Sequence, residues 1–128
     1  MDIHTHQQID PELCGQPEEL QPGYCRVAFK TTGRMVADSK GLVHGGFVFG
    51  LADYAAMLAV NDPHVVLGAA EVKFLKPVSV GEELVAEARV SAVSGRKHLV
   101  DVMVLRDTDK LLEGRLTCFV LDRHVLDA

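Results

Sequence analysis

Polar and apolar residues alternate along three segments in the second half of the chain, with the period of two that predicts half-buried β-strands. The segments are Glu83–Val93, His98–Arg106 and Leu111–Leu121. Their apolar positions are Leu84, Ala86, Ala88, Val90 and Ala92, then Val100, Val102 and Val104, then Leu112, Leu116, Cys118 and Val120. Short turn sequences separate the segments, so we expect an antiparallel meander. Two earlier strands are expected at Tyr24–Thr32 and Val65–Lys76.

One segment breaks this pattern. Phe47–Val60 is apolar at nearly every position, contains Asp53 as its one charged residue, and is followed by Asn61-Asp62-Pro63. It is too long for an ordinary strand, and a proline after it cannot continue a helix. We therefore predict a helix that is buried on most sides.

One buried helix followed by long antiparallel strands predicts an α+β fold in which the sheet wraps around the helix. The 128 residues suit one domain spanning 1–128, and no repeat or linker divides them. Residues 1–22 are polar and hold three of the five prolines, so we expect an irregular lead-in with at most a short helical turn.

Composition narrows the possible partners. Thirteen basic and eighteen acidic residues give a net charge of −5, and only seven side chains are aromatic, so we expect no nucleic-acid partner. No apolar run approaches the roughly 18 residues of a membrane span, so we expect no membrane partner. Three scattered cysteines favour reduced thiols in a cytoplasmic protein. The His4-Thr5-His6 pair is interpreted as a mobile terminus, and no metal site is expected.

The sequence His44-Gly45-Gly46 stands directly before the predicted helix. Glycines at a helix N-terminus let a ligand approach the free backbone N–H groups, which can polarise a carbonyl and hold developing negative charge. The alternative is that the two glycines serve only close packing at the helix start. The residues alone leave both interpretations open.

Asp53 is the second candidate for chemistry. A carboxylate within an apolar helix is unfavourable unless a partner or a cleft receives it, and its helical neighbours Gly46, Gly50 and Met57 offer no compensating charge. A carboxylate in such a place suits a general base or a nucleophile. Pairing with a group from elsewhere in the fold is the structural alternative.

Gly45 and Asp53 are eight residues apart, which is about 12 Å along a helix that rises ~1.5 Å per residue. A single reacting carbon cannot lie within about 3 Å of both groups. Either the two do not cooperate, or a second subunit supplies one of them, as a two-fold dimer would.

The segment Gly41–Asn61, with its histidine-glycine-glycine sequence and an aspartate nine residues after the histidine, resembles the hotdog-fold thioesterases of the phenylacetate-pathway type. Glu71–Val78, reading EVKFLKPV, and then Gly81 resemble the strand that follows the central helix in that family. The likeness covers roughly residues 24–121.

The resemblance implies a hotdog fold, with a long central helix wrapped by a five- to six-stranded antiparallel sheet that continues across a homodimer. It implies hydrolysis of an acyl thioester of coenzyme A or acyl carrier protein, without a metal or a cofactor beyond the coenzyme A of the substrate. Gly45 would polarise the carbonyl, Asp53 of the opposite subunit would activate water, and His44 would orient the loop or the substrate. Two dimers would associate into a homotetramer.

Further candidate site residues follow from comparison with this pattern. Asp38 stands where the family often has asparagine, so it either affects catalysis or simply forms a turn. Tyr54 follows the aspartate, where relatives commonly have small residues, and is expected to narrow the acyl pocket. Gly46 is expected to contact substrate. The basic residues considered for the coenzyme A phosphates are Arg34, Lys73, Lys76, Arg96 and Lys97.

Two other functions stay open. A non-catalytic module that binds acyl-CoA would need the same pocket without a working base. A hydroxyacyl-thioester dehydratase is less well supported. Such enzymes typically have a segment similar to His-Phe-Pro, whereas His44 is followed by Gly-Gly. The sequence does not identify the acyl group.

Overall fold

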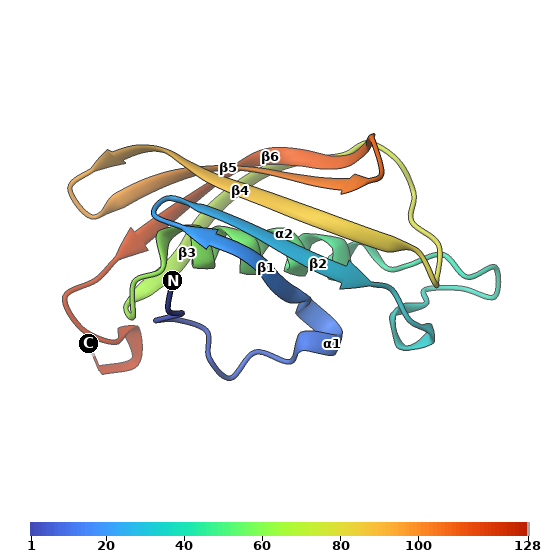
Figure 1. The fold of residues 1–128 in the computed structure, drawn as a ribbon, viewed down its shortest axis with the longest axis horizontal. Coiled ribbons are helices and arrows are strands. Elements are labelled where there is room, and N and C mark those ends of the chain that lie inside the picture. The colour runs from blue at the N-terminus through green and yellow to red at the C-terminus, as the bar shows by residue number, and fades with distance from the viewer. Residues whose placement is uncertain (128) are drawn as a thin grey trace.

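The computed structural model describes residues 1–127 as one sheet and one long helix (Figure 1). The elements are α1 (Pro11–Cys14), β1 (Gln16–Gln21), β2 (Tyr24–Lys30), the 3₁₀ turn η1 (Gly33–Met35), α2 (Gly45–Val60), β3 (Val65–Phe74), β4 (Glu83–Ser94), β5 (Lys97–Arg106), β6 (Asp109–Val120) and the 3₁₀ turn η2 (Val125–Asp127). The α+β, hotdog arrangement expected from the sequence is confirmed, with six strands.

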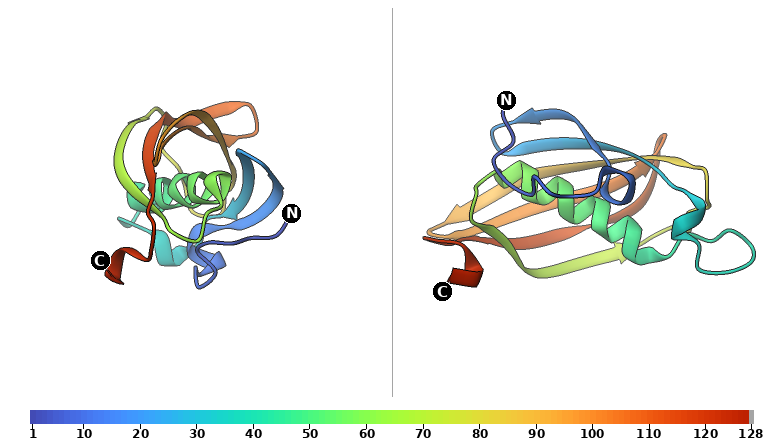
Figure 2. Two further views of the ribbon diagram at one scale, coloured as in Figure 1. Left: turned by 90° about the vertical axis from the view of Figure 1, so that its left-hand side faces the viewer. Right: turned by 90° about the horizontal axis from the view of Figure 1, so that it is seen from below.

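The sheet has the order β1-β2-β4-β5-β6-β3, and every neighbouring pair is antiparallel. β2 pairs with β4 while α2 and β3 intervene in the chain, so the helix crosses under the sheet between the two halves. Figure 2 shows the strands curving around α2, which lies in the hollow of the sheet. This topology leaves β3 at one edge, paired only with β6.

The core lies between α2 and the inward face of the sheet. In the helix, positions such as Leu51, Ala55 and Leu58 are fully buried, as expected for a helix apolar on nearly all sides. The alternating residues of the strands meet it: Val100, Val102 and Val104 are 0–4 % exposed, and Leu84, Ala86 and Ala88 are 0–1 % exposed. The period of two therefore identified the correct face of each central strand.

The helix begins earlier than its apolar run. It starts at Gly45, because the two glycines continue the helical backbone behind the N-cap residue His44. It ends at Val60, and the C-cap residue Asn61 takes the left-handed conformation with φ 53° and donates its backbone N–H to the Met57 carbonyl. Asparagine tolerates this conformation better than most residues, and it closes the helix before Pro63.

The expectation of an irregular lead-in over residues 1–22 is wrong for Gln16–Gln21, which forms strand β1 against β2. This strand lies at the second edge of the sheet and is mostly exposed, so it lacks the apolar alternation that would have revealed it. An edge position also tolerates Pro17. Gly23, with φ 76°, makes the tight turn into β2.

The N-terminal residues run along the side of α2 that faces away from the sheet (Figure 2, right). The Asn61 side chain holds them: its Oδ1 accepts from His4 N at 2.8 Å, and its Nδ2 donates to the Asp2 carbonyl at 2.8 Å. Ile3, Ile9 and Leu13 pack against the core. The interpretation of the two histidines as a mobile terminus is therefore not supported.

None of the helices in residues 1–127 combines the length and the apolar character needed to cross a membrane.

Candidate active site

The N-terminus of α2 presents two backbone N–H groups that have no protein acceptor within residues 1–127. His44 adopts φ −62° and ψ 130°, donates its own N–H to the Met35 carbonyl at 2.9 Å, and accepts from Phe47 N at 3.0 Å. The N–H groups of Gly45 and Gly46 therefore stay available. Together with the helix dipole they can stabilise a developing oxyanion.

A pocket of about 310 Å³ opens beside Gly45. Its walls are Leu42, Val43, Gly45, Val48, Phe74, Leu75, Lys76, Pro77 and Val78, drawn from the loop before α2, the first turn of α2 and the connection from β3 to β4. The two segments that carry the resemblance thus meet at this pocket, Phe74–Val78 from one and Gly45 from the other. Sequence reasoning named both segments but did not assign Phe74, Leu75 or Leu42 to the site.

His44 lies over the first turn of the helix. A Cβ added to Gly46 would come within 3.1 Å of the imidazole, and the ring meets the edge of Phe47 with centroids 6.2 Å apart. A larger residue at position 46 would crowd the His44 ring, so the position favours glycine. This contact fits an orienting role for His44 and explains the second glycine by packing.

Asp53 is the one residue within 1–127 with a buried side-chain polar atom that lacks a partner: its Oδ1 is shielded from solvent and makes no hydrogen bond. Burial raises the pKa of this carboxyl from 3.8 to about 6. Its charge in turn helps to raise the pKa of the Cys14 and Cys118 thiols, which places both cysteines near it. An unpaired carboxylate in apolar surroundings is unfavourable, so this position is typical of function rather than stability.

Asp53 and Gly46 share one stripe of α2, with Gly50 between them. Gly46 is exposed, Gly50 and Asp53 are half-buried, and nothing lies within 4 Å of where a Cβ of Gly50 would be. The stripe is thus open along the helix. Because Gly45 and Asp53 are about 12 Å apart on one helix, a single chain does not bring them to a common point.

Asp38 acts as a turn residue in this chain. It is exposed, and its Oδ1 accepts hydrogen bonds from Lys40 N at 2.9 Å and Leu42 N at 3.2 Å, which closes the loop before α2. The idea that a carboxylate here raises the pKa of Asp53 is not supported within the chain, because burial alone accounts for that shift.

Tyr54 is 6 % exposed and belongs to the core, where burial raises its pKa and the Cys25 and Cys14 thiols add to the effect. It lines neither the pocket beside Gly45 nor the groove of about 1120 Å³ over the outer face of the sheet. The expectation that Tyr54 narrows an acyl pocket stays a prediction, because the acyl site is expected between two subunits.

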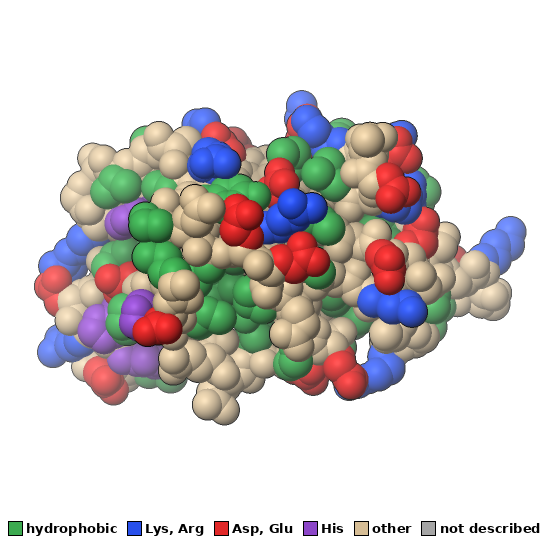
Figure 3. Space-filling model, in the orientation of Figure 1, with side chains coloured by type: hydrophobic (Ala, Val, Ile, Leu, Met, Phe, Trp, Pro, Cys, Tyr) green, Lys and Arg blue, Asp and Glu red, His purple; other side chains and the backbone are tan. Residues whose placement is uncertain are grey.

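Three candidate phosphate-binding residues lie away from Gly45. Lys73 points to the outer face of the sheet, opposite to Phe74, since successive residues of a strand alternate. Arg96 lies in the β4–β5 turn and Lys97 begins β5, at the end of the molecule opposite to the start of α2 (Figure 1), and Arg96 pairs with Asp122. Of the basic residues considered, Lys76 alone lines the pocket. Figure 3 shows Lys and Arg interspersed with Asp and Glu over the face drawn.

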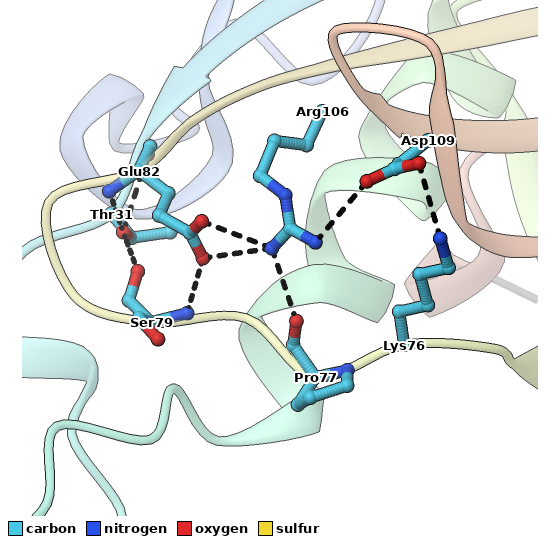
Figure 4. A network of polar contacts seen from close by, with 7 residues as sticks. All are labelled: Thr31, Lys76, Pro77, Ser79, Glu82, Arg106 and Asp109. Carbon is cyan, nitrogen blue, oxygen red and sulfur yellow. Dashed lines mark hydrogen bonds and ion pairs between the residues drawn. The ribbon is translucent and has the colours of Figure 1, made fainter.

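A polar network fixes the wall that Phe74–Val78 forms (Figure 4). The Glu82 carboxylate accepts two bonds from Arg106 Nη1, at 2.9 and 3.0 Å, and one from Ser79 N. Arg106 also donates to the Pro77 carbonyl at 3.2 Å, and Lys76 Nζ lies 3.1 Å from Asp109 Oδ1. The loop between β3 and β4 is thereby tied to the β5–β6 turn.

A second, larger groove of about 1120 Å³ lies over the outer face of the sheet. Its charged side chains compensate one another across the strands: Arg115 pairs with Asp101 at 3.0 Å, and Lys110 with Glu113 at 2.9 Å. It holds neither the free N–H groups nor Asp53. In the described part of the chain, no three His, Cys, Asp or Glu side chains gather as metal ligands would.

Known proteins resemble this chain along most of its length. A methylthioribose-1-phosphate isomerase of Aquifex aeolicus is 54 % identical over 123 residues, which are 95 % of this chain and 27 % of that protein. The transcription factor FapR of Caldanaerobacter subterraneus is 28 % identical over 92 % of this chain and 60 % of its own length. The chain therefore spans only about a quarter and about three fifths of these two relatives.

Solved structures share the whole fold. Protein PH1136 of Pyrococcus horikoshii superposes with a TM-score of 0.98 at 52 % identity, covering 99 % of this chain and 98 % of that one. An asparagine-to-aspartate mutant of the phenylacetic acid degradation protein PaaI of Thermus thermophilus superposes with a TM-score of 0.79 at 28 % identity, covering 85 % of this chain and 95 % of that one.

The family model of the thioesterase superfamily matches residues 40–113, which include the start of α2, Asp53 and the Phe74–Val78 wall. The match covers more than half of the chain and both segments that carried the resemblance. The chain belongs to the thioesterase superfamily and has its hotdog fold.

Proposed function

We propose that the protein hydrolyses an acyl thioester, of coenzyme A or of acyl carrier protein, to a free acid and a thiol. The observation that carries the proposal is the unpaired, buried Oδ1 of Asp53 together with the free N–H of Gly45 at an apolar pocket. A carbonyl bound at Gly45 would receive the electrophilic help that thioester hydrolysis needs, and Asp53 would supply the base.

In the proposed reaction, the thioester carbonyl accepts a hydrogen bond from Gly45 N–H. A water molecule loses a proton to the Asp53 carboxylate of the second subunit while its oxygen attacks the carbonyl carbon. The negative charge collects on the carbonyl oxygen and is stabilised by the start of α2. The C–S bond then breaks, and the sulfur leaves as a thiolate that takes up the proton.

The edge strand β3 supports a dimer as the working unit. Ala70, Val72 and Phe74 lie opposite Leu116, Gly114 and Leu112 of β6, so they face the same side of the sheet as the core. Nevertheless Ala70 is exposed, and Phe74 is 56 % exposed. An uncovered apolar face on an unpaired ten-residue edge favours pairing with a second copy, whose own β3 would extend the sheet.

Antiparallel pairing of two β3 strands would place opposite ends of the two protomers side by side. The start of α2 in one protomer would then lie at the same end as the β4–β5 turn of the other. In this arrangement Asp53 of the partner subunit approaches Gly45. The partner subunit's Arg96 and the partner subunit's Lys97 reach the side where the nucleotide phosphates of coenzyme A would extend, while Lys76 comes from the same chain as Gly45.

Thiol release from a panel of acyl-CoA substrates tests the proposal. We expect hydrolysis by the wild-type chain and loss of at least a hundredfold in Asp53→Asn, with unchanged circular dichroism. Full activity in that variant contradicts the assignment of the base. Absence of hydration of an enoyl-CoA in the same preparation separates the proposed reaction from a dehydratase.

A second candidate function is a non-catalytic module that binds acyl thioesters. The observation in its favour is that the transcription factor FapR contains a segment related to 92 % of this chain. This alternative predicts that acyl-CoA raises the melting temperature while no substrate of the panel releases thiol. The same two measurements therefore decide between the candidates.

A further inference from the structure

The large apolar side chains that stay exposed within residues 1–127 gather at the two ends of the molecule. At the end where α2 begins they are Val36, Leu42, Phe74, Leu75 and Val80. At the opposite end they are Met1, Val93, Val125 and Leu126. Single exposed apolar residues are ordinary on protein surfaces, whereas grouped ones mark surfaces that meet another molecule. The chain therefore has two candidate contact surfaces, one at each end.

The exposed side chains at the start of α2 form one surface, which we call the apolar end: Val36, Leu42, Phe74 and Leu75. A short antiparallel bridge holds Val36 beside Val43. Val43 lines the same pocket as Leu42, Phe74 and Leu75. The apolar end thus borders the pocket of the candidate active site, and in a single chain its four residues are 41–56 % exposed.

The C-terminal segment, Leu121–Asp127, carries the most exposed of these apolar residues. It leaves β6 beside the start of β3, where Leu121 N donates to the His64 carbonyl at 3.2 Å. Its turn η2 is closed by a hydrogen bond from Leu126 N to His124 Nδ1 at 3.0 Å. None of the η2 residues is buried, and Leu126 is 83 % exposed. The segment is thus held in place by the protein, while its leucine side chain contacts little of the chain.

The C-terminal segment lies on the same side of the sheet as α2, beside the start of β3 (Figure 1; Figure 2). When two β3 strands pair antiparallel over their whole length, Val65 of the partner subunit lies opposite Phe74. Phe74 faces the core side of the sheet, and neighbouring strands are about 4.8 Å apart. The C-terminal segment of the partner subunit then comes to lie beside the apolar end.

We propose that the C-terminal segment of each protomer docks on the apolar end of the other, with Leu126 of the partner subunit packed against Phe74 and Leu42. The proposal rests on the β3-paired dimer of the proposed function and adds a second contact to it. The charges of the two surfaces are complementary: Lys40, in the loop that carries Leu42, and Asp127 both lack an ion pair within residues 1–127. Each site would then be bordered by the C-terminal segment of the other chain.

Leu126 allows a test that leaves the protomer itself unchanged. Because this side chain is already exposed in the single chain, Leu126→Ser should not alter the fold. Burial of a leucine in an interface favours association by a factor of about ten or more, so we expect the dimer dissociation constant to rise at least about tenfold in sedimentation across a dilution series. Leu126→Met keeps an apolar side chain and should stay within about threefold of the wild type. Gln21→Ser, an exposed change on β1 at the other edge of the sheet, should have no effect.

A chemical cross-link tests the contact directly. The background is Cys14→Ser, because the other two native cysteines are buried. Cysteines introduced by Phe74→Cys and Leu126→Cys lie at opposite ends of one protomer, so a short bis-maleimide cannot join them within it. In the docked dimer we expect the reagent to link the two chains into a covalent dimer on a denaturing gel. Gln21→Cys combined with Leu126→Cys, in the same background, should give no covalent dimer.

These measurements separate the docking from the proposed hydrolysis. A cross-linked dimer that Leu126→Ser weakens, without thiol release from any acyl-CoA, would support the docking and contradict the hydrolase. Thiol release by a dimer in which Leu126→Ser and Leu126→Met dissociate alike and no cross-link forms would overturn the docking and leave the hydrolase intact. A wild-type chain that sediments as a monomer at all concentrations would overturn the docking as well.

Discussion

The ring of Phe74 lies directly against the backbone of Gly45: its Cε1 would be 3.5 Å from a Cβ built on the glycine. This is an ordinary van der Waals distance, so the position has room for a methyl group. Gly45 is also the first residue of α2, where a helix accepts proline readily, and His44 before it has the ψ of 130° that a residue preceding proline adopts. A proline at position 45 would therefore remove the backbone N–H with little change to the backbone around it.

Gly45→Pro is expected to lower kcat by a factor of about 10²–10³, because it removes one donor to the oxyanion. Gly45→Ala keeps the N–H and adds only the methyl group, so its kcat should stay within a few-fold of wild type. Steady-state thiol release and thermal melts of both variants check this. Equal kcat in the two variants, with equal Tm, would show that the N–H of Gly45 takes no part in the reaction.

Asp53→Asn is expected to stabilise the fold above neutral pH while it removes activity. The folded-state pKa of about 6 lies above the ordinary value of 3.8, so folding takes up a proton between these values and stability falls as pH rises through this window. The asparagine avoids this penalty, which has a ceiling of about 3 kcal/mol. Melting curves should show a higher Tm for the variant at pH 8 and a difference that disappears toward pH 4.

The same titration predicts the pH dependence of catalysis. Asp53 must be ionised to accept a proton from water, so kcat/KM should rise with pH, reach half its maximum near pH 6 and level off above pH 7. A pH profile of thiol release between pH 4.5 and 8 measures the midpoint. A midpoint of the kcat/KM profile near pH 4 would mean that the carboxyl is solvated in the assembled protein. A profile that does not change with pH would show that Asp53 is not the base.

Mixing two inactive variants tests whether each site is shared between subunits. When Asp53→Asn and Gly45→Pro chains are unfolded together and refolded, half of the dimers should be mixed, and each mixed dimer would contain one intact site. Recovery of about a quarter of wild-type activity is expected for a two-fold dimer with shared sites. If each chain held its own complete site, mixing would restore nothing.

Ala70→Asp is expected to produce monomers without activity. The substitution places a charge on the uncovered core-side face of β3, where pairing with a second copy would bury it. Size-exclusion chromatography with light scattering measures the mass, and circular dichroism checks the fold. Gln21→Asp, an exposed change on β1 at the other edge of the sheet, serves as the control and should keep both the mass and the activity of the wild type.

Much of the fold could be predicted because α2 and the central strands bury one consistent set of positions. Val100, Val102 and Val104 are spaced by two and all face the helix, and Asp53 is the one charge in an apolar helix. β1 could not be predicted, because its pairing is made by backbone groups at an exposed edge and leaves no apolar pattern.

The candidate site was only partly predictable for a different reason. The glycines and Asp53 are recognisable by residue type, but the basic candidates depend on which end of the molecule a turn occupies. Arg96 lies at the β4–β5 turn, and sequence distance from Gly45 does not give its position in space. Asp38 was ambiguous because the same carboxylate suits chemistry or a turn, and its bonds to the loop backbone favour the turn.

The ion pair between Glu82 and Arg106 has a consequence for the free energy of ligand binding. Its two side chains are only 28 % and 24 % exposed, so salt screens it less than it screens a pair in open solvent. The wall opposite Gly45 is thus braced before any ligand arrives. A ligand that binds beside Gly45 then does not have to supply the free energy for ordering this loop.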